Sequence, residues 1–255
     1  MNGKLALVSP ARRAPSAVEM PEELLEKAMA SRSPASRARW AQRGLACRAP
    51  LDRTTHALLL RQLYMSYYET RRFDRAKEVA LQAIELDVLR DVFHEDAARA
   101  DLALGAADDA VVHLRLAARR GPPSRRPFHM WTLGSVLFFN HRYAEAITAL
   151  ARAVRWGTTD KPLFRAHLAL VRIAAGEQVE GLQATIDDLA AAPCGQGYGR
   201  FVLGHLAYAT GAWESARPLL EAFVKRTEAA GPVRVLALDA ELRMARTTLA
   251  KMAAN

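Results

Sequence analysis

Residues 130–153 read MWTLGSVLFFNHRYAEAITALARA, and this stretch decides the fold. Its first half places Leu133 beside Gly134 in an apolar run, and its second half places Tyr143 three residues before Ala146. Small residues let two helix backbones approach closely, while large apolar residues fill the space beside the crossing. A short polar link separates the halves. The stretch therefore predicts two antiparallel helices that cross at their small residues.

The same arrangement recurs along the chain at intervals of 34, 36, 35 and 35 residues. The small residues that define these intervals are Ala76, Ala110, Ala146, Gly181 and Ala216. Five residues before each of them stands a residue of the expected turn, namely Arg71, Gly105, His141, Gly176 or Gly211. Self-similarity of this period indicates a stack of repeated helix pairs, because one pair alone cannot bury its apolar face.

Turn residues and hydrophobic spacing place the helices and divide the chain into four segments. The expected segments are a mobile tail over 1–20, an atypical helix pair over 21–53, a solenoid over 54–231 and a capping segment over 232–255. The expected helix pairs of the solenoid are 55–70 with 73–88, 91–104 with 107–120, 127–140 with 143–156, 162–175 with 178–190, and 197–210 with 213–229. One last helix is expected over 233–252, with a polar outer side.

The repeated pattern resembles that of the tetratricopeptide repeat family, whose unit is a helix–turn–helix of about 34 residues. The best-matched unit carries Met130, Leu133, Gly134, Leu137, Tyr143, Ala146, Leu150 and Ala153. A second carries Leu203, Gly204, Gly211, Trp213, Ala216 and Leu220, whereas the unit over 162–195 is degenerate. The resemblance implies an all-α fold, a right-handed α-α superhelix with a C-terminal capping helix. It covers about residues 55–250.

In that family the first helix of each pair lines a concave groove that binds a peptide or helix of a partner protein. Carried over, the resemblance implies a groove formed by Arg61, Met65, Tyr68, Glu95, Arg99, Trp131, Ser135, Phe138, His167, Phe201, His205 and Tyr208. Aromatic side chains supply much of the binding energy at such surfaces, so Trp131 and Phe201 are the expected anchors. The alternative is that these aromatic side chains only fill space between repeats.

The chain is basic, with a net charge of +9, and the excess lies near its start. Residues 1–75 hold 14 basic and 7 acidic side chains, against 22 and 20 in residues 76–255. Two clusters form the candidate basic patch: Arg37, Arg39 and Arg43, and then Arg119, Arg120, Arg125 and Arg126. Such clusters suit an acidic partner or anionic surface, but a solvated loop and a genome biased toward arginine codons are the more common explanations. No DNA- or RNA-binding signature accompanies them, which disfavours sequence-specific nucleic-acid recognition.

Motifs for catalysis are absent from the sequence, which contains no phosphate-binding glycine loop with Lys and Ser/Thr, no HExxH and no nucleophile elbow. Cys47 and Cys194 are the only cysteines and lack metal-ligand spacing. We therefore expect no enzymatic activity, no cofactor and no metal. No run approaches the length of a membrane span, and we expect a protein of the bacterial cytoplasm.

These observations favour a scaffold or adaptor that binds a protein partner in its concave groove. Two alternatives remain open at this point. One is a regulator that docks on an anionic partner or surface through its basic N-terminal half. The other is a secretion-type chaperone that holds an extended client. The sequence does not identify the partner, the pathway or the oligomeric state.

Overall fold

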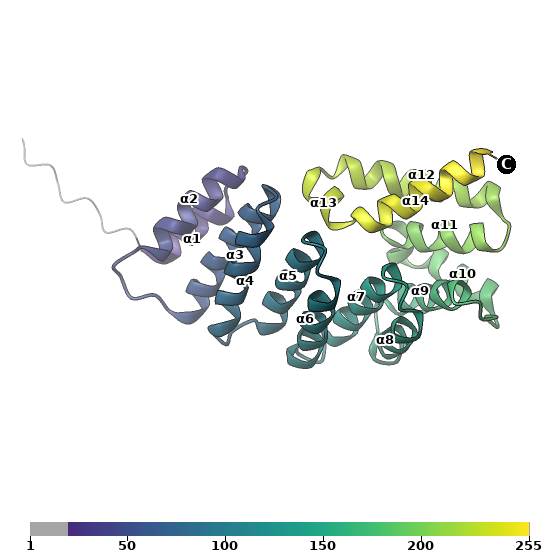
Figure 1. The fold of residues 1–255 in the computed structure, drawn as a ribbon, viewed down its shortest axis with the longest axis horizontal. Coiled ribbons are helices and arrows are strands. Elements are labelled where there is room, and N and C mark those ends of the chain that lie inside the picture. Colours follow the sequence, from purple (N-terminus) through teal and green to yellow (C-terminus); the bar gives the residue numbers. More distant parts are fainter. Residues whose placement is uncertain (1–19, 255) are drawn as a thin grey trace, which may run out of the picture.

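The computed structural model describes residues 20–254, and within this range the chain forms α-helices, one short 3-10 helix and connecting turns, without any strand. The expected tail over 1–20 lies outside the described residues except for Met20. Each helix packs against the helices that precede and follow it in the chain (Figure 1). The fold is therefore an all-α solenoid, which confirms the predicted fold class.

Most of the helices form consecutive antiparallel pairs. The first pair is α1 (Pro21–Met29) and α2 (Pro34–Leu45). The following pairs are α3 (Arg53–Glu69) with α4 (Phe73–Glu85), α5 (Arg90–Ala103) with α6 (Ala107–Arg120), α7 (Arg126–Phe139) with α8 (Tyr143–Trp156), α9 (Lys161–Ala174) with α10 (Leu182–Ala191), and α11 (Gly199–Ala209) with α12 (Trp213–Ala229). A 3-10 turn, η1 (Pro193–Gln196), precedes α11, and the described chain finishes with α13 (Pro232–Ala237) and α14 (Asp239–Ala254).

The crossing of α7 and α8 depends on the small residues that the repeat predicts. Ala146 is fully buried. A Cβ atom added at Gly134 would lie 2.5 Å from Cγ of Leu150 and 3.4 Å from the Ala146 carbonyl oxygen, so no side chain fits there. Gly204 of α11 meets the equivalent residues of α12 in the same way. The predicted phase of the repeat is correct at both crossings.

The turns between paired helices also repeat. The five turn residues have left-handed backbones, with φ of 58° at Arg71, 80° at Gly105, 58° at His141, 82° at Gly176 and 80° at Gly211. After α7 the His141 N–H donates to the Phe138 carbonyl at 3.0 Å, and the next N–H reaches back to Leu137 at 2.9 Å. These two bonds are those of a Schellman motif, which satisfies the last carbonyls of a helix and reverses the chain.

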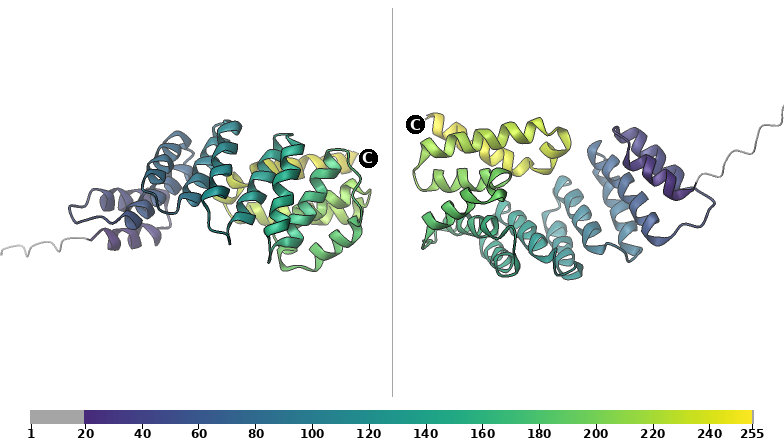
Figure 2. Two further views of the ribbon diagram at one scale, coloured as in Figure 1. Left: turned by 90° about the horizontal axis from the view of Figure 1, so that it is seen from below. Right: turned by 180° about the vertical axis from the view of Figure 1, so that it is seen from behind.

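The path of the helix pairs is strongly curved, so that the last helices return toward the first half of the chain (Figures 1 and 2). Leu236 of α13 packs against the apolar core of the N-terminal half, which includes Tyr68 and Phe93. A second, larger core runs from Ala98 to Met252. An apolar contact therefore joins the two ends of the curve across its inner side.

Two predictions about the C-terminal half are wrong. The degenerate unit begins its second helix at Leu182 rather than at 178, and Gly181 is an exposed residue with φ 62° rather than a crossing residue. The expected last helix over 233–252 is broken at Leu238, where φ is −120°. The break separates α13 from α14 and lets the two helices point in different directions (Figure 1).

We expect Ala146→Leu to lower the free energy of unfolding by about 1–3 kcal/mol, because the longer side chain must enter space filled by the α7 backbone. Urea denaturation measures the change. Ala151→Leu is the matched control, because Ala151 lies exposed on the same helix. Equal denaturation midpoints for the two variants would show that Ala146 is not at a tight crossing.

Candidate partner-binding site

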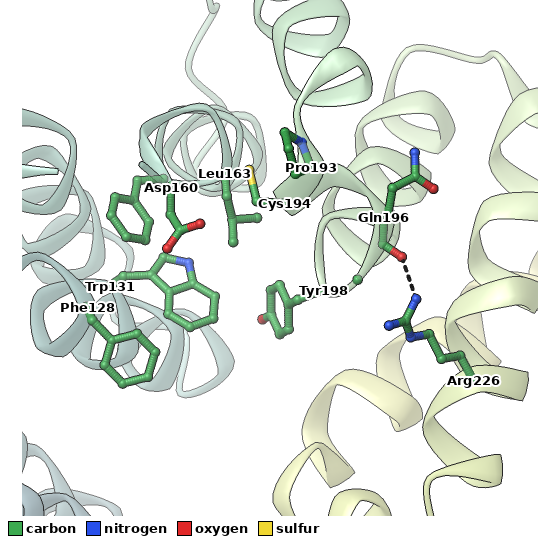
Figure 3. Close-up of a pocket in the computed structure, with 11 residues that line it drawn as sticks. Phe128, Trp131, Asp160, Leu163, Pro193, Cys194, Gln196, Tyr198 and Arg226 are labelled. Carbon is green, nitrogen blue, oxygen red and sulfur yellow. Dashed lines mark hydrogen bonds between the residues drawn. The ribbon is translucent and has the colours of Figure 1, made fainter. Parts of the chain in front are cut away.

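A cleft lined by aromatic rings opens on the inner side of the curve, between α7, α9, η1 and α12 (Figure 3). Its volume is about 360 Å³, which is within the range of small binding pockets. We call it the aromatic cleft. Its lining consists of Phe128, Trp131, Asp160, Leu163, Phe164, Pro193, Cys194, Gln196, Gly197, Tyr198 and Arg226.

Trp131 is fixed in the wall of the cleft by a buried histidine. Its indole Nε1–H donates to Nδ1 of His167 at 3.0 Å. Burial, with a smaller contribution from the nearby His205, lowers the pKa of His167 to about 3. His167 is therefore neutral at physiological pH, and its Nδ1 can accept the bond. The indole presents a ring of fixed orientation to the cleft.

Two further rings extend this wall. The ring of Tyr198 meets that of Trp131 edge to face, with centroids 4.9 Å apart. Phe128 lies 5.7 Å from Trp131 on the other side and is 41% exposed. Figure 3 shows the three rings bordering one opening. Aromatic groups with one open face are typical anchoring points for an apolar side chain of a ligand.

Tyr198 is held in turn by the last helix. Its hydroxyl donates to Oε1 of Glu241 in α14 at 3.1 Å. Burial raises the pKa of Glu241 to about 7. It also raises the pKa of the Tyr198 hydroxyl well above its usual value. The shape of the aromatic cleft thus depends on a contact between residues 43 positions apart in the chain.

Two groups of opposite charge border the cleft. Asp160 lies at the start of α9, near the indole of Trp131, and is exposed. Arg226 of α12 donates from Nη1 to the Gln196 carbonyl oxygen at 3.1 Å. The lining therefore combines an apolar wall with one acidic and one basic group. This combination suits a peptide segment better than a ligand of one charge sign.

The structure places most of the predicted groove residues inside the protein. Phe201, one of the two expected anchors, is fully buried and packs against Tyr198, Phe139 and Phe223. It is a core residue, so its prediction as an anchor is wrong. The other predicted groove residues that are buried are Tyr68, Glu95, Ser135, Phe138, His167 and His205. Those that remain partly exposed are Arg61, Met65, Arg99, Trp131 and Tyr208.

The predicted polar end of the groove is a network of internal ion pairs centred on α5. Arg61 Nε lies 3.0 Å from Oδ2 of Asp96, which is buried, and Arg99 pairs with Glu95 one turn away on the same helix. His129 lies 3.4 Å from Glu95 through Nδ1. These charges are partnered within the chain, so Arg61, Glu95 and Arg99 are not free contacts for a ligand, which corrects their prediction.

His129 connects this network to α7. Its Nε2 lies 2.9 Å from Oδ2 of Asp91. Burial favours the neutral imidazole, but the contacts with Glu95 and Asp91 outweigh it and raise the pKa of His129. Burial favours a higher pKa for the Asp91 carboxyl, but hydrogen bonds from His129 and Arg125 outweigh it and lower this pKa. The network holds α5 and α7 together through charge.

The predicted basic patch is divided between structural and exposed arginines. Arg125 pairs with Asp91 at 2.7 Å, and this structural role corrects its prediction as a contact residue. Arg37 pairs with Glu69 at 2.5 Å. Arg126, although exposed, donates to the Gly121 carbonyl. The remaining members, Arg39, Arg43, Arg119 and Arg120, are exposed.

The sequence analysis missed Phe128, Tyr198 and Glu241. For Phe128 a signal was present, because it lies three residues before Trp131 and so shares a face of α7 with it. Tyr198 falls at the start of the helix expected over 197–210 and lies just before α11 in the structure, and no motif marks it as a site residue. Glu241 looks like an ordinary polar residue of a capping helix. Only the packing of α14 against α11 shows that its carboxyl is buried.

Among residues 20–254, no group of three or more His, Cys, Asp or Glu side chains is placed to bind a metal ion. None of the helices in this part of the chain is both long and apolar enough to cross a bilayer. Neither a protein-family model nor a curated protein matches the sequence.

We expect Glu241→Gln to become more stable relative to the wild type as the pH rises from about 4.5 to about 7. In this window the folded wild type keeps a proton that the unfolded chain releases, so its stability falls with pH. Gln does not titrate, and the difference should reach about 3 kcal/mol and then level off. Urea denaturation at a series of pH values measures it.

The buried His167 and His205 have lowered pKa values, so below about pH 6.5 they make the free energy of unfolding rise with pH. This contribution is the same in the wild type and in Glu241→Gln, so it cancels in the difference between them. Glu221→Gln, at an exposed position of α12, is the control. A difference between Glu241→Gln and the wild type that does not change with pH would contradict a raised pKa of the buried Glu241 carboxyl.

Proposed function

We propose that this chain is a tetratricopeptide-type scaffold or adaptor of the cytoplasm, and that it binds a segment of a partner protein in the aromatic cleft. The observation that carries the proposal is the wall of Phe128, Trp131 and Tyr198. Two of its three rings are fixed by buried hydrogen bonds, and the third remains exposed. The helical-pair architecture and its repeated crossings are consistent with this family.

The energetics favour the cleft as a contact site. Rings that are already immobilised lose little conformational entropy when a partner binds, so more of the contact energy contributes to affinity. Aromatic residues are also enriched among the side chains that dominate binding energy. The cleft has room for one or two side chains of a partner, while Asp160 and Arg226 supply polar groups at its border. The role is binding, with no chemical step.

We expect Phe128→Ala to reduce capture of the partner at least about tenfold, because it removes the exposed ring of the wall. The measurement is affinity capture by the immobilised chain from cells that express it, quantified by mass spectrometry. Trp131→Phe keeps a ring but loses the bond to His167, and should give an intermediate loss.

The matched control is Trp156→Ala on α8, which removes an exposed aromatic side chain away from the cleft. The helicity of all variants is compared by circular dichroism. Equal recovery of the same partners by the wild type, Phe128→Ala and Trp156→Ala would show that the aromatic cleft is not the binding site.

A second candidate function rests on the basic surface of α2. Arg39 and Arg43 are exposed and lie over the ring of Trp40, with guanidinium carbons 5.0 and 4.8 Å from its centroid. Both charges lie against the same ring at the surface, and a cluster of exposed guanidinium groups suits an anionic partner. This supports docking on an acidic protein or surface through the N-terminal half.

For this second candidate we expect a labelled polyglutamate peptide to bind the wild type. Its affinity should fall about tenfold or more between roughly 50 and 200 mM salt. Arg39→Glu combined with Arg43→Glu should abolish the binding. Phe128→Ala should leave it unchanged, because the aromatic cleft lies outside α2. Binding that does not depend on salt would contradict the electrostatic mechanism.

A further inference from the structure

A second groove lies between α9, α11 and α14, at the opposite ends of these helices from the aromatic cleft. Its volume is about 400 Å³. We call it the C-terminal groove. Its lining consists of Leu170, Ile173, Ala174, His205, Tyr208, Ala209, Arg243, Met244, Thr247, Thr248 and Lys251. It shares no lining residue with the aromatic cleft.

The groove is formed because α14 runs in the same direction as α11. Glu241 contacts Tyr198 near the start of α11, while Thr248 and Lys251 border the groove beside the end of α11. Most of the surface within it is apolar, with Leu170, Ile173 and Met244 among the contributing side chains. A hydrophobic groove bordered by helices is a common receptor for an amphipathic helix.

The charge at the border of this groove has one sign. Arg243 and Lys251 are both exposed and lie eight residues apart on α14, which is about 12 Å along the helix axis. No Asp or Glu lines the groove. Arg243 lies 3.1 Å from Asp239 one turn earlier, but both side chains are largely exposed, so water screens this pair. The α14 side of the groove therefore presents two positive charges beside an apolar floor.

A buried histidine lies at the floor of the groove. His205 lines the groove and is only 2% exposed, yet its Nε2 has no hydrogen-bond partner among the described residues. Buried polar atoms are satisfied in most folded proteins, and one left unpaired costs stability. Burial lowers the pKa of His205 to about 4, so the ring is neutral at physiological pH. The histidine therefore adds no positive charge of its own to the floor of the groove.

We propose that the C-terminal groove docks an acidic amphipathic helix of a partner protein. The apolar face of that helix lies on Leu170, Ile173 and Met244, and its carboxylates, about two turns apart, lie beside Arg243 and Lys251. The complementarity of charge selects this occupant over a basic or uncharged helix. This site is separate from the aromatic cleft and does not depend on the function proposed for it.

The test uses the full chain and two synthetic helical peptides. Both carry leucines on one face, spaced one turn apart. One peptide has glutamates flanking that face, and the other has lysine at every one of these positions. Fluorescence anisotropy at fixed ionic strength measures the affinity of each. We expect the glutamate peptide to bind the wild type at least about tenfold more tightly than the lysine peptide.

Charge reversal then tests the location. Arg243→Glu combined with Lys251→Glu should reverse the preference, so that the lysine peptide binds more tightly. Lys251→Glu alone should reduce the preference without disturbing the first turn of α14. The matched control is Arg152→Glu with Arg155→Glu, two exposed positions of α8 that change the net charge equally. The control should keep the preference of the wild type.

Several results would overturn the proposal. Equal affinity for the two peptides would remove the role of charge, and an equal loss in the α8 control would show that the attraction is only long-range. Loss of glutamate-peptide binding in Phe128→Ala would place the peptide in the aromatic cleft instead. Self-association of the wild type that Lys251→Glu abolishes would make a second copy of this chain the occupant. Retained binding by Phe128→Ala, with the reversal by the double variant, supports the C-terminal groove whether or not the aromatic cleft binds a partner.

Discussion

The close crossing of two helices at a small residue is the constraint on which the rest of this structure depends. Gly134 and Ala146 bring α7 and α8 together, and Leu150 fills the space left beside them. Any larger side chain at Gly134 would collide with Leu150. The same crossing recurs between α11 and α12, and stacking of the helix pairs produces the curved path of the chain. This curvature gives the molecule its concave inner side.

The inner side of the curve is charged in the N-terminal half of the chain and mainly apolar in the C-terminal half. In the N-terminal half, α5 places Glu95 and Asp96 where a ligand would lie, but Arg61, Arg99 and His129 from this and the neighbouring helices neutralise them. Removing one member of such a buried network leaves another charge without a partner, which costs far more than the pair contributes. The network thus serves to join α3, α5 and α7, and both apolar openings of the inner side involve helices of the C-terminal half.

The last two helices shape that surface. Because the chain breaks at Leu238, α13 packs through Leu236 against the N-terminal core while α14 lies along α11. In this position α14 supplies Glu241 to hold Tyr198 in the aromatic cleft and Arg243 and Lys251 to border the C-terminal groove. A segment that the sequence presents as a cap is therefore part of both candidate sites. Burial in this position raises the pKa of the Glu241 carboxyl to about 7.

The sequence by itself determined the features that depend on residues close together in the chain. The helix pairs, the crossings at Ala146 and Ala216 and the left-handed turns at positions such as Gly105 and Gly211 follow from local spacing, because one repeat carries all the residues that each requires. Only the tertiary structure decided which inner side chains are exposed. Phe201 is buried because α12 and neighbouring aromatic residues pack around it. Phe128 and Trp131 instead border the opening that lies between α7, the start of α9 and η1. Burial of that kind depends on the curvature of the whole stack and on where its last helix returns, and no local pattern contains that information.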